Sequence, residues 1–375
     1  MTTGIPDINL CQRDEEEAWQ DGRGALWELL MKKFAIATAL VATLFSSVAF
    51  AEEVQLMKGL EVREGTNPTI PADKFKKPAP WKIGFSIWGF GNTYMIQMAE
   101  EAKYYASTNH DIKNFIFTNA DSKPAKQIAD IEDLIAQGVD ALVIAPISLS
   151  AVSPIIEKAT AAGIPVIVHS TAVDTDKYTV DLQGDPVHFG KVMGDFLVKQ
   201  LNGKGHIWVL RGQAGVSEDQ YRYDGLTEAL KGTDITISSE QNGDWAYDKG
   251  KQVCESLALS DPNPDGIWSS GAAMSQACID VFTELGQPIP PITGEGNNGF
   301  FRAWKASGVK SMAAVFSPEQ GAAAVRAAVS LLEGKELHHR YVARPDPILE
   351  DTRDQYFRAD LNDNLWFPVS LPKEK

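Results

Sequence analysis

The sequence predicts an α/β protein built from two doubly wound parallel-sheet lobes that are joined by a hinge. From Trp81 onward, short apolar runs alternate with stretches of helical period. The apolar runs are continuous, which is typical of parallel strands that are covered on both faces. The strand and helix pairs are also too numerous for one open sheet, and two lobes suit a chain of 375 residues.

Each expected strand is a short apolar run, and each expected helix has apolar residues at helical spacing. The strands are expected at residues 82–87, 114–118, 141–144, 166–169, 206–210, 235–239, 267–269, 292–293 and 312–316. One more short strand is expected before Asp185, and a last one after His338-His339. The helices are expected at residues 93–107, 125–136, 151–162, 188–200, 218–230, 247–259, 274–285, 299–306 and 319–332. Helix stops are expected at Gly138, Gly163, Gly203, Gly232 and Gly286.

The segment 31–51 has the pattern of a secretory signal peptide. Met31-Lys32-Lys33 forms a basic start, an apolar run follows, and Ala49-Phe50-Ala51 is an A-x-A site, so cleavage is expected after Ala51. A transmembrane helix is the weaker alternative, because the run falls short of about 20 residues. We therefore expect an exported, periplasmic protein.

Residues 1–30 lie ahead of this pattern and are acidic at residues 14–17. Acidic side chains do not suit the region before a basic signal start, so these residues form a doubtful upstream extension and Met31 is the expected start. A genuine cytoplasmic extension is the alternative.

The net charge of −15 and the isoelectric point of about 4.9 disfavour partners with phosphate backbones or anionic lipid surfaces. Three cysteines are too few for a disulfide-rich scaffold. Cys254 and Cys278 both fall on expected helices in an oxidising compartment. They form either a disulfide or two buried thiols, and the sequence leaves both alternatives open.

Residues 52–80 are polar and rich in Pro and Lys, and they predict an extended lead-in before the first lobe. The break between the lobes is expected near residues 183–186. Ligands of doubly wound sheets sit beyond the carboxyl ends of the strands. The residues that follow each strand are therefore the candidates for function.

The loop after the first strand resembles a dinucleotide fingerprint, because Gly89-Phe90-Gly91-Asn92-Thr93-Tyr94 nearly matches G-x-G-x-x-G. The third glycine is replaced by Tyr94, and the loop also contains Trp88 and Phe90. Aromatic faces suit the C–H faces of a sugar ring better than a pyrophosphate. The alternative for Trp88 and Phe90 is core packing, and for Asn92 a helix cap.

Amide, hydroxyl and carboxylate side chains follow other strands and could bind sugar hydroxyls. The candidates that follow these strands, including the aromatic Trp245, are Asn119, Asp121, His169, Ser170, Gln213, Trp245, Asn297 and Asn298. No G-x-S-x-G, H-E-x-x-H or P-loop motif occurs in the sequence. A metal pair at His338-His339 is less favoured than a solvated turn. The sequence therefore favours a binding protein without catalytic residues, metal or cofactor.

From about Trp81 to Ile348 the sequence resembles the type I periplasmic binding proteins, the ribose-binding and LacI-like substrate-binding proteins of ABC sugar importers. The matching segments, in order, are residues 82–94, 122–127, Asp133-Leu134, 138–144, 162–167, Gly190-Lys191, Gly194-Asp195 and 222–225. The resemblance implies an N-terminal lobe of residues 81–184 plus 317–345 and a C-terminal lobe of residues 185–316 plus 346–375. Crossings between the lobes are implied near Asp185, near Phe316 and at residues 344–347.

The resemblance also implies roles for particular residues in a cleft between the lobes. Expected ligand-binding residues are Trp88, Phe90, Asn92, Tyr94, His169, Ser170, Gln220, Trp245, Asn297, Asn298 and Phe316. Ser170-Thr171 stand where similar proteins have an Asp-Arg pair, and Gln220 stands where they have an Arg. Gly271 and Gly296 stand where they have Asn and Asp at two later strand ends. We therefore expect a pocket that is poor in charge and rich in aromatic and amide groups.

The resemblance implies a monomer that captures a monosaccharide or polyol and delivers it to a membrane permease of an ABC importer. Ribose itself is disfavoured by the missing charged residues. One alternative is a ligand-sensing subunit for a membrane kinase or chemoreceptor, and another is an exported nucleotide-dependent enzyme.

Overall fold

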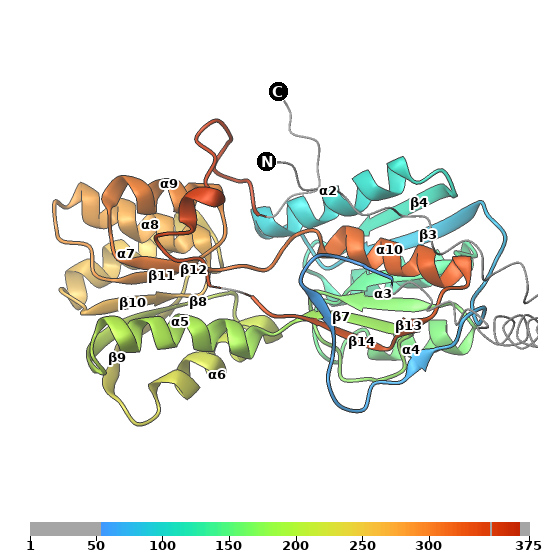
Figure 1. Ribbon diagram of the computed structural model, residues 1–375, viewed down its shortest axis with the longest axis horizontal. Coiled ribbons are helices and arrows are strands. Elements are labelled where there is room, and N and C mark those ends of the chain that lie inside the picture. Colours follow the sequence, from blue (N-terminus) through green and yellow to red (C-terminus); the bar gives the residue numbers. More distant parts are fainter. Residues whose placement is uncertain (1–53, 346, 368–375) are drawn as a thin grey trace, which may run out of the picture. The chain divides into compact units, whose positions relative to one another are not determined.

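The computed structural model describes residues 54–345 and 347–367 (Figure 1). The upstream extension expected at residues 1–30 and the signal peptide expected at residues 31–51 lie outside the described residues. Within the described ranges, no helix has both the length and the apolar character that a bilayer crossing demands.

Two large parallel sheets organise the described chain. The first has the strand order β1-β14-β7-β6-β5-β3-β4, and all its neighbours are parallel except the antiparallel pair β1 and β14. Its strands are β1 (Leu60–Val62), β3 (Trp81–Ile87), β4 (Ile112–Asn119), β5 (Ala141–Ala145), β6 (Val166–His169), β7 (Val180–Gly184) and β14 (Arg340–Ala343).

The second sheet is parallel throughout, in the order β12-β11-β10-β8-β9. Its strands are β8 (Lys204–Arg211), β9 (Asp234–Asn242), β10 (Gly266–Ser269), β11 (Ile292–Glu295) and β12 (Ser311–Ala314). The predicted class, two doubly wound α/β lobes, is therefore confirmed.

Helices cover both faces of each sheet (Figure 1). On the first sheet, α2 (Thr93–Thr108) and α10 (Gln320–Glu333) cover one face, and α3 (Pro124–Ala136) and α4 (Ser153–Ala161) cover the other. On the second sheet, α5 (Pro186–Gln200) and α6 (Ser217–Leu230) lie opposite α7 (Tyr247–Ser260), α8 (Ala272–Glu284) and α9 (Asn298–Ser307). The short 3₁₀ helix η2 (Arg353–Gln355) follows near the C-terminus.

The continuous apolar runs result from burial on both faces of a strand. In β5, Val143 belongs to the core beneath α2 and α10, whereas Leu142 and Ile144 belong to the core beneath α3 and α4. Successive side chains of a strand point to opposite faces, so both sets must be apolar. The five glycines expected to stop helices all have positive φ, which side chains with a Cβ adopt at a cost: Gly138, Gly163, Gly203, Gly232 and Gly286.

The predicted lead-in at residues 52–80 is partly incorporated into sheets. Strand β1 pairs with β14 at the edge of the first sheet, and β2 (Thr69–Ile70) pairs with β13 (Leu337–His338). Pro68 and Pro71 flank β2 instead of interrupting it, and short edge strands tolerate such neighbours. The predicted extended lead-in thus contributes two short strands that pair with later parts of the chain.

The strand predicted at residues 312–316 ends earlier, because β12 stops at Ala314. Phe316 leaves the sheet and stacks on Phe189, with ring centroids 5.0 Å apart. The chain passes between the sheets after β7, after β12 and after β14, and Ile348 then forms a bridge to Ala313.

Of the two alternatives for the cysteines, a disulfide or two buried thiols, the structure has the disulfide. Cys254 of α7 and Cys278 of α8 form a disulfide, with Cα atoms 5.4 Å apart. Both residues are fully buried, so the bond joins two helices within the core of the second lobe.

Candidate functional site

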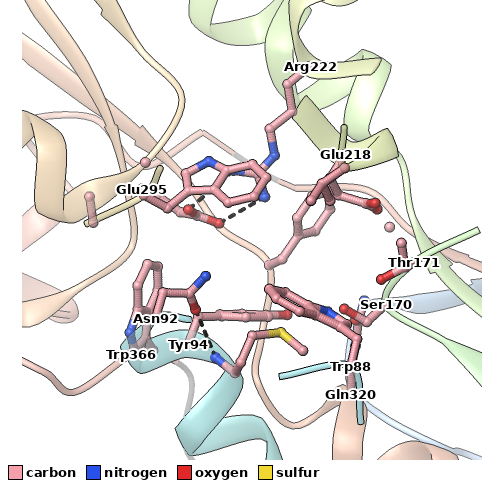
Figure 2. Close-up of a pocket in the computed structure, with 17 residues that line it drawn as sticks. Trp88, Asn92, Tyr94, Ser170, Thr171, Glu218, Arg222, Glu295, Gln320 and Trp366 are labelled. Atoms are coloured by element: carbon pink, nitrogen blue, oxygen red, sulfur yellow. Dashed lines mark hydrogen bonds and ion pairs between the residues drawn. The ribbon is translucent and has the colours of Figure 1, made fainter. Parts of the chain in front are cut away.

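One pocket collects side chains from the carboxyl ends of both sheets (Figure 2). Its cavity volume is about 60 Å³. Its lining is Trp88, Asn92, Tyr94, Met95, Ser170, Thr171, Gly184, Val216, Glu218, Arg222, Trp245, Gly271, Ala272, Glu295, Phe316, Gln320 and Trp366. This position is where doubly wound sheets place their ligands.

Aromatic rings provide much of the lining: Trp88, Tyr94, Trp245, Phe316 and Trp366. Tyr94 meets Trp366 edge to face, with ring centroids 5.3 Å apart, and its hydroxyl donates to the main-chain oxygen of Ser317. Burial raises the pKa of Tyr94 above its ordinary value, so the phenol keeps its proton. The rings form apolar faces against which a flat, partly apolar ligand could stack.

Two glycines position Trp245. A Cβ on Gly212 would lie 2.0 Å from the Trp245 ring, and one on Gly271 would lie 2.5 Å from it. The indole N–H donates to the hydroxyl of Ser270 at 3.2 Å. Trp245 is thus held between two backbone segments that must lack side chains, which also explains Gly271 at this strand end.

An ion pair lies on the second-lobe side of the pocket (Figure 2). Arg222 Nη1 and Nη2 donate to the two carboxylate oxygens of Glu295, each at 3.3 Å. Nη1 also donates to the main-chain oxygen of Ser270 at 2.6 Å, and the guanidinium lies 4.0 Å from the centroid of Phe189. The pair is buried, and desolvation raises the pKa of Glu295 although Arg222 opposes the shift.

Glu218 adds a second carboxylate at the beginning of α6. Its side chain accepts from the hydroxyl of Ser217 at 3.2 Å. Burial raises the pKa of Glu218 to about 7, although Arg222 and the hydroxyl of Ser217 act in the opposite direction. The expectation of a charge-poor pocket was therefore wrong, because Glu218, Arg222 and Glu295 all line it.

Neutral polar groups line the first-lobe side. Asn92 caps α2, since its Oδ1 accepts from the Met95 N–H at 3.0 Å, and its amide nitrogen points into the pocket (Figure 2). Asn92 therefore combines the cap role and the pocket position that the sequence analysis treated as alternatives. Ser170 and Thr171 follow β6, and Gln320 begins α10. These groups can donate to and accept from a hydroxylated ligand.

Six of the expected ligand-binding residues line this pocket: Trp88, Asn92, Tyr94, Ser170, Trp245 and Phe316. Two others of the first lobe do not. Phe90 is 38% exposed and stacks on Phe117, with centroids 5.9 Å apart. His169 is fully buried against Phe85, and burial lowers its pKa to about 3. His169 still belongs to β6, and the alternation of a strand turns it toward the core while Ser170 reaches the pocket.

Three expected residues of the second lobe also lie outside the pocket. Gln220 is exposed and donates to Asp224 at 2.7 Å. Asn297 caps α9 by accepting from two main-chain N–H groups. Asn298 is fully buried and donates to three main-chain oxygens of the C-terminal segment, those of Arg358, Leu361 and Asn362.

Sequence reasoning missed Glu218, Arg222, Glu295, Gln320 and Trp366 as pocket residues. Arg222 lies two positions after Gln220, which was among the expected ligand-binding residues. Glu295 lies one position before Gly296, which stands where similar proteins have a polar residue. The periodicity of the helix and of the strand could have indicated that Arg222 and Glu295, and not their neighbours, point toward the pocket. Trp366 lies beyond the span of the resemblance, so no motif pointed to it.

Among the described residues, no group of three or more His, Cys, Asp or Glu side chains has an arrangement that could hold a metal ion. The polar groups of the pocket are amides, hydroxyls, one guanidinium and two carboxylates. This donor set suits reversible binding of a polar organic molecule.

Residues 83–336 match the family described as periplasmic binding protein domain. A ribose import binding protein of Bacillus subtilis is 25% identical over 307 residues, which cover 82% of this chain and 95% of the relative. A galactofuranose-binding protein of Escherichia coli is 33% identical over 194 residues, covering 50% of this chain and 60% of the relative.

A solved structure has the same fold over most of this chain. It is the periplasmic binding protein component of the arabinose ABC transporter from Shewanella sp. ANA-3, bound to α- and β-L-arabinofuranose. The TM-score is 0.67 and the identity 25%, over 73% of this chain and 93% of that one.

Proposed function

Because the chain belongs to the periplasmic binding protein family, we propose that it captures a monosaccharide or polyol between its lobes and delivers it to an ABC permease. The observation that carries the proposal is the pocket lining, in which five aromatic rings stand beside amide, hydroxyl and charged groups. Sugar rings need both kinds of surface, since their C–H faces stack and their hydroxyls form hydrogen bonds.

The relatives support a sugar or polyol as the ligand. The relative from Bacillus subtilis is named as a ribose import binding protein, and the relative from Escherichia coli as a galactofuranose-binding protein. A protein of Mycolicibacterium smegmatis that is 25% identical over 215 residues is named as a xylitol-binding protein. These relatives are import or binding proteins, which favours transport over the sensor alternative. Members of this family bind solutes and do not convert them.

We further propose the lobe boundaries that the resemblance implied. The N-terminal lobe would comprise residues 81–184 and 317–345, with strands β1 and β2 added to it, and the C-terminal lobe residues 185–316 and 346–375. The three crossings near Asp185, near Phe316 and at residues 344–347 would form the hinge. Closure about these crossings would bury the ligand and create the surface that a permease recognises.

The proposal includes export. The signal pattern at residues 31–51 and the family together support a periplasmic, monomeric protein that is cleaved after Ala51. No part of the mechanism needs a nucleic acid or a cofactor.

A ligand screen by thermal unfolding tests the proposal. The protein is first unfolded in urea and refolded, which removes any retained ligand, and is then melted with pentoses, hexoses and polyols. A ligand that binds only the folded state adds about 2.7 kcal/mol at 100 times its Kd, so at least one compound should raise the Tm by several degrees. The absence of any shift with every sugar and polyol would contradict the proposal.

A further inference from the structure

The pocket contains more negative than positive side chains. Among its described lining residues, Arg222 is the one cation, and Glu218 and Glu295 are the carboxylates. The guanidinium of Arg222 already bonds both oxygens of Glu295 and the main-chain oxygen of Ser270. An anionic ligand would have to compete with Glu295 for these donors.

Glu218 has no such partner. In residues 54–345 and 347–367 no ion pair within 4 Å involves its carboxylate, and its hydrogen bond comes from the neutral hydroxyl of Ser217. Figure 2 shows the Glu218 carboxylate beside Thr171, on the opposite side from the bonded pair of Arg222 and Glu295. Among the described residues, the second carboxylate of the pocket therefore has no direct ion-pair partner, although Arg222 acts on it electrostatically.

The charged groups around Glu218 come from several elements. Arg222 lies on the same helix, Glu295 ends β11 and Asp181 belongs to β7, and all three act on it electrostatically or line the same pocket. A second cavity of about 370 Å³ adjoins Glu218 on the hinge side and is lined by Arg63, Asp185, Tyr221 and Arg344. Arg63 and Arg344 are exposed to solvent, which screens their charge, and Arg344 faces Asp185 at 3.9 Å.

We propose that Glu218 makes this pocket select its ligand by charge. Neutral sugars and polyols and their amine-bearing analogues are accepted, whereas sugar acids and sugar phosphates are excluded. This inference rests on the proposed sugar- or polyol-binding function.

The physical reason is restricted access of solvent, since Glu218 is only partly exposed. A carboxylate that is incompletely solvated repels a second negative charge more strongly than a carboxylate in water does, because less water screens the pair. A ligand ammonium would instead be attracted by the Glu218 carboxylate and by the aromatic faces of Trp88 and Trp245, which line the same pocket. The pKa of Glu218, raised by burial to about 7, supports this, since a nearby cation would favour its ionised form and an anion its protonated form.

Matched ligands test the proposal by calorimetry with the refolded full-length protein. The sets are D-galactose with D-galacturonate and D-galactosamine, D-glucose with D-glucuronate and D-glucosamine, D-ribose with D-ribonate and D-ribose 5-phosphate, and xylitol with xylonate. In the unmodified protein at pH 8, each acid or phosphate should bind at least tenfold more weakly than its neutral parent.

The variant Glu218→Gln keeps the hydrogen-bonding shape and removes the charge. In this variant, the ratio of the affinity for a neutral sugar to the affinity for its acid should fall about tenfold. The affinity for an amino sugar, relative to that for its neutral parent, should fall by a similar factor. Glu228→Gln is the matched control, because Glu228 is an exposed residue of the same helix outside the pocket. This control should leave all the ratios unchanged.

A pH series with the unmodified protein gives a second test that needs no variant. Sugar acids stay ionised from pH 5.5 to pH 8.5, whereas Glu218 loses its proton in this range. Discrimination against acids should therefore increase with pH.

The outcomes separate the inference from the proposed function. If neutral sugars bind and their acids bind equally well, the inference is overturned and the proposed function stands. The same holds if Glu218→Gln leaves the affinity ratios between neutral sugars and their acids unchanged. If no neutral sugar or polyol binds, the proposed function fails and the inference fails with it.

Discussion

Trp245 illustrates how single residues build this site. Its ring occupies space that Gly212 and Gly271 leave empty, and Ser270 binds its N–H group. A residue with this environment cannot easily change its rotamer, so its face lines the pocket in one orientation. Preorganised aromatic anchors of this kind dominate binding energies in buried sites.

We expect Trp245→Ala to weaken sugar binding by about 2 kcal/mol or more, because the stacking face and its buried area are lost. Calorimetry with the sugar identified by thermal unfolding measures the change. Phe90→Ala is the matched control, since Phe90 belongs to the expected binding loop but lies on Phe117 outside the pocket. Equal affinities for unmodified protein and Trp245→Ala would remove Trp245 from the site.

At the scale of elements, the segment after β14 connects the two lobes a further time. Asn298 and Gly299 of α9 bind main-chain groups of residues 358–365, and Asn297 forms a bridge with Trp366. From this position Trp366 reaches the first lobe, where its ring N–H donates to Thr93 at 2.9 Å. The C-terminal segment therefore places an aromatic ring of the pocket against α2.

Gln97 of α2 holds this segment through both main-chain groups of Trp366, accepting from its N–H at 2.8 Å and donating to its oxygen at 3.1 Å. We expect Gln97→Met to lower the free energy of unfolding by about 1–3 kcal/mol, because two buried main-chain groups lose their partner. Ligand affinity should fall several-fold, since Trp366 is no longer held in place.

Urea unfolding and calorimetry measure the two effects of Gln97→Met. Gln355→Met is the control, because Gln355 is exposed in the same C-terminal segment. A Gln97→Met protein with unchanged stability and affinity would contradict the holding role of these hydrogen bonds.

At the scale of the whole molecule, the pocket depends on both lobes and on the crossings between them. Gly184 at the end of β7 and Phe316 after β12 lie so close that a Cβ on Gly184 would be 2.6 Å from the Phe316 ring. Both residues line the pocket. Segments at or after the ends of two different strands, at the passages between the sheets, thus touch each other and the pocket.

We expect saturating ligand to reduce the radius of gyration of the protein, because closure of the lobes makes the molecule more compact. Small-angle X-ray scattering with and without the bound sugar measures the change. Trp245→Ala at the same sugar concentration should keep the larger radius. An unchanged radius in the unmodified protein at saturation would exclude closure by this ligand.

Trp88, Asn92, Ser170 and Trp245, which the sequence predicted at or shortly after strand ends, line the pocket, whereas Asn297 and Asn298, also predicted after a strand end, do not. Such positions depend on local periodicity, which a sequence displays. Where the choice lay between near neighbours, the pocket is lined by the residue that was not chosen, Arg222 instead of Gln220 and Glu295 instead of Gly296. There the side chain that reaches the pocket depends on how a helix or strand is rotated in the packed lobe.

The sequence by itself determined the fold class and the order of most strands and helices, because these depend on which residues are buried along each element, and its resemblance to known proteins indicated the family. Tertiary structure alone decided the charges of the pocket and the role of the C-terminal segment. Arg222 and Glu295 are 73 residues apart, and Gln97 and Trp366 are 269 residues apart. Pairings over such distances leave no local period in the sequence, and only the folded chain brings them together.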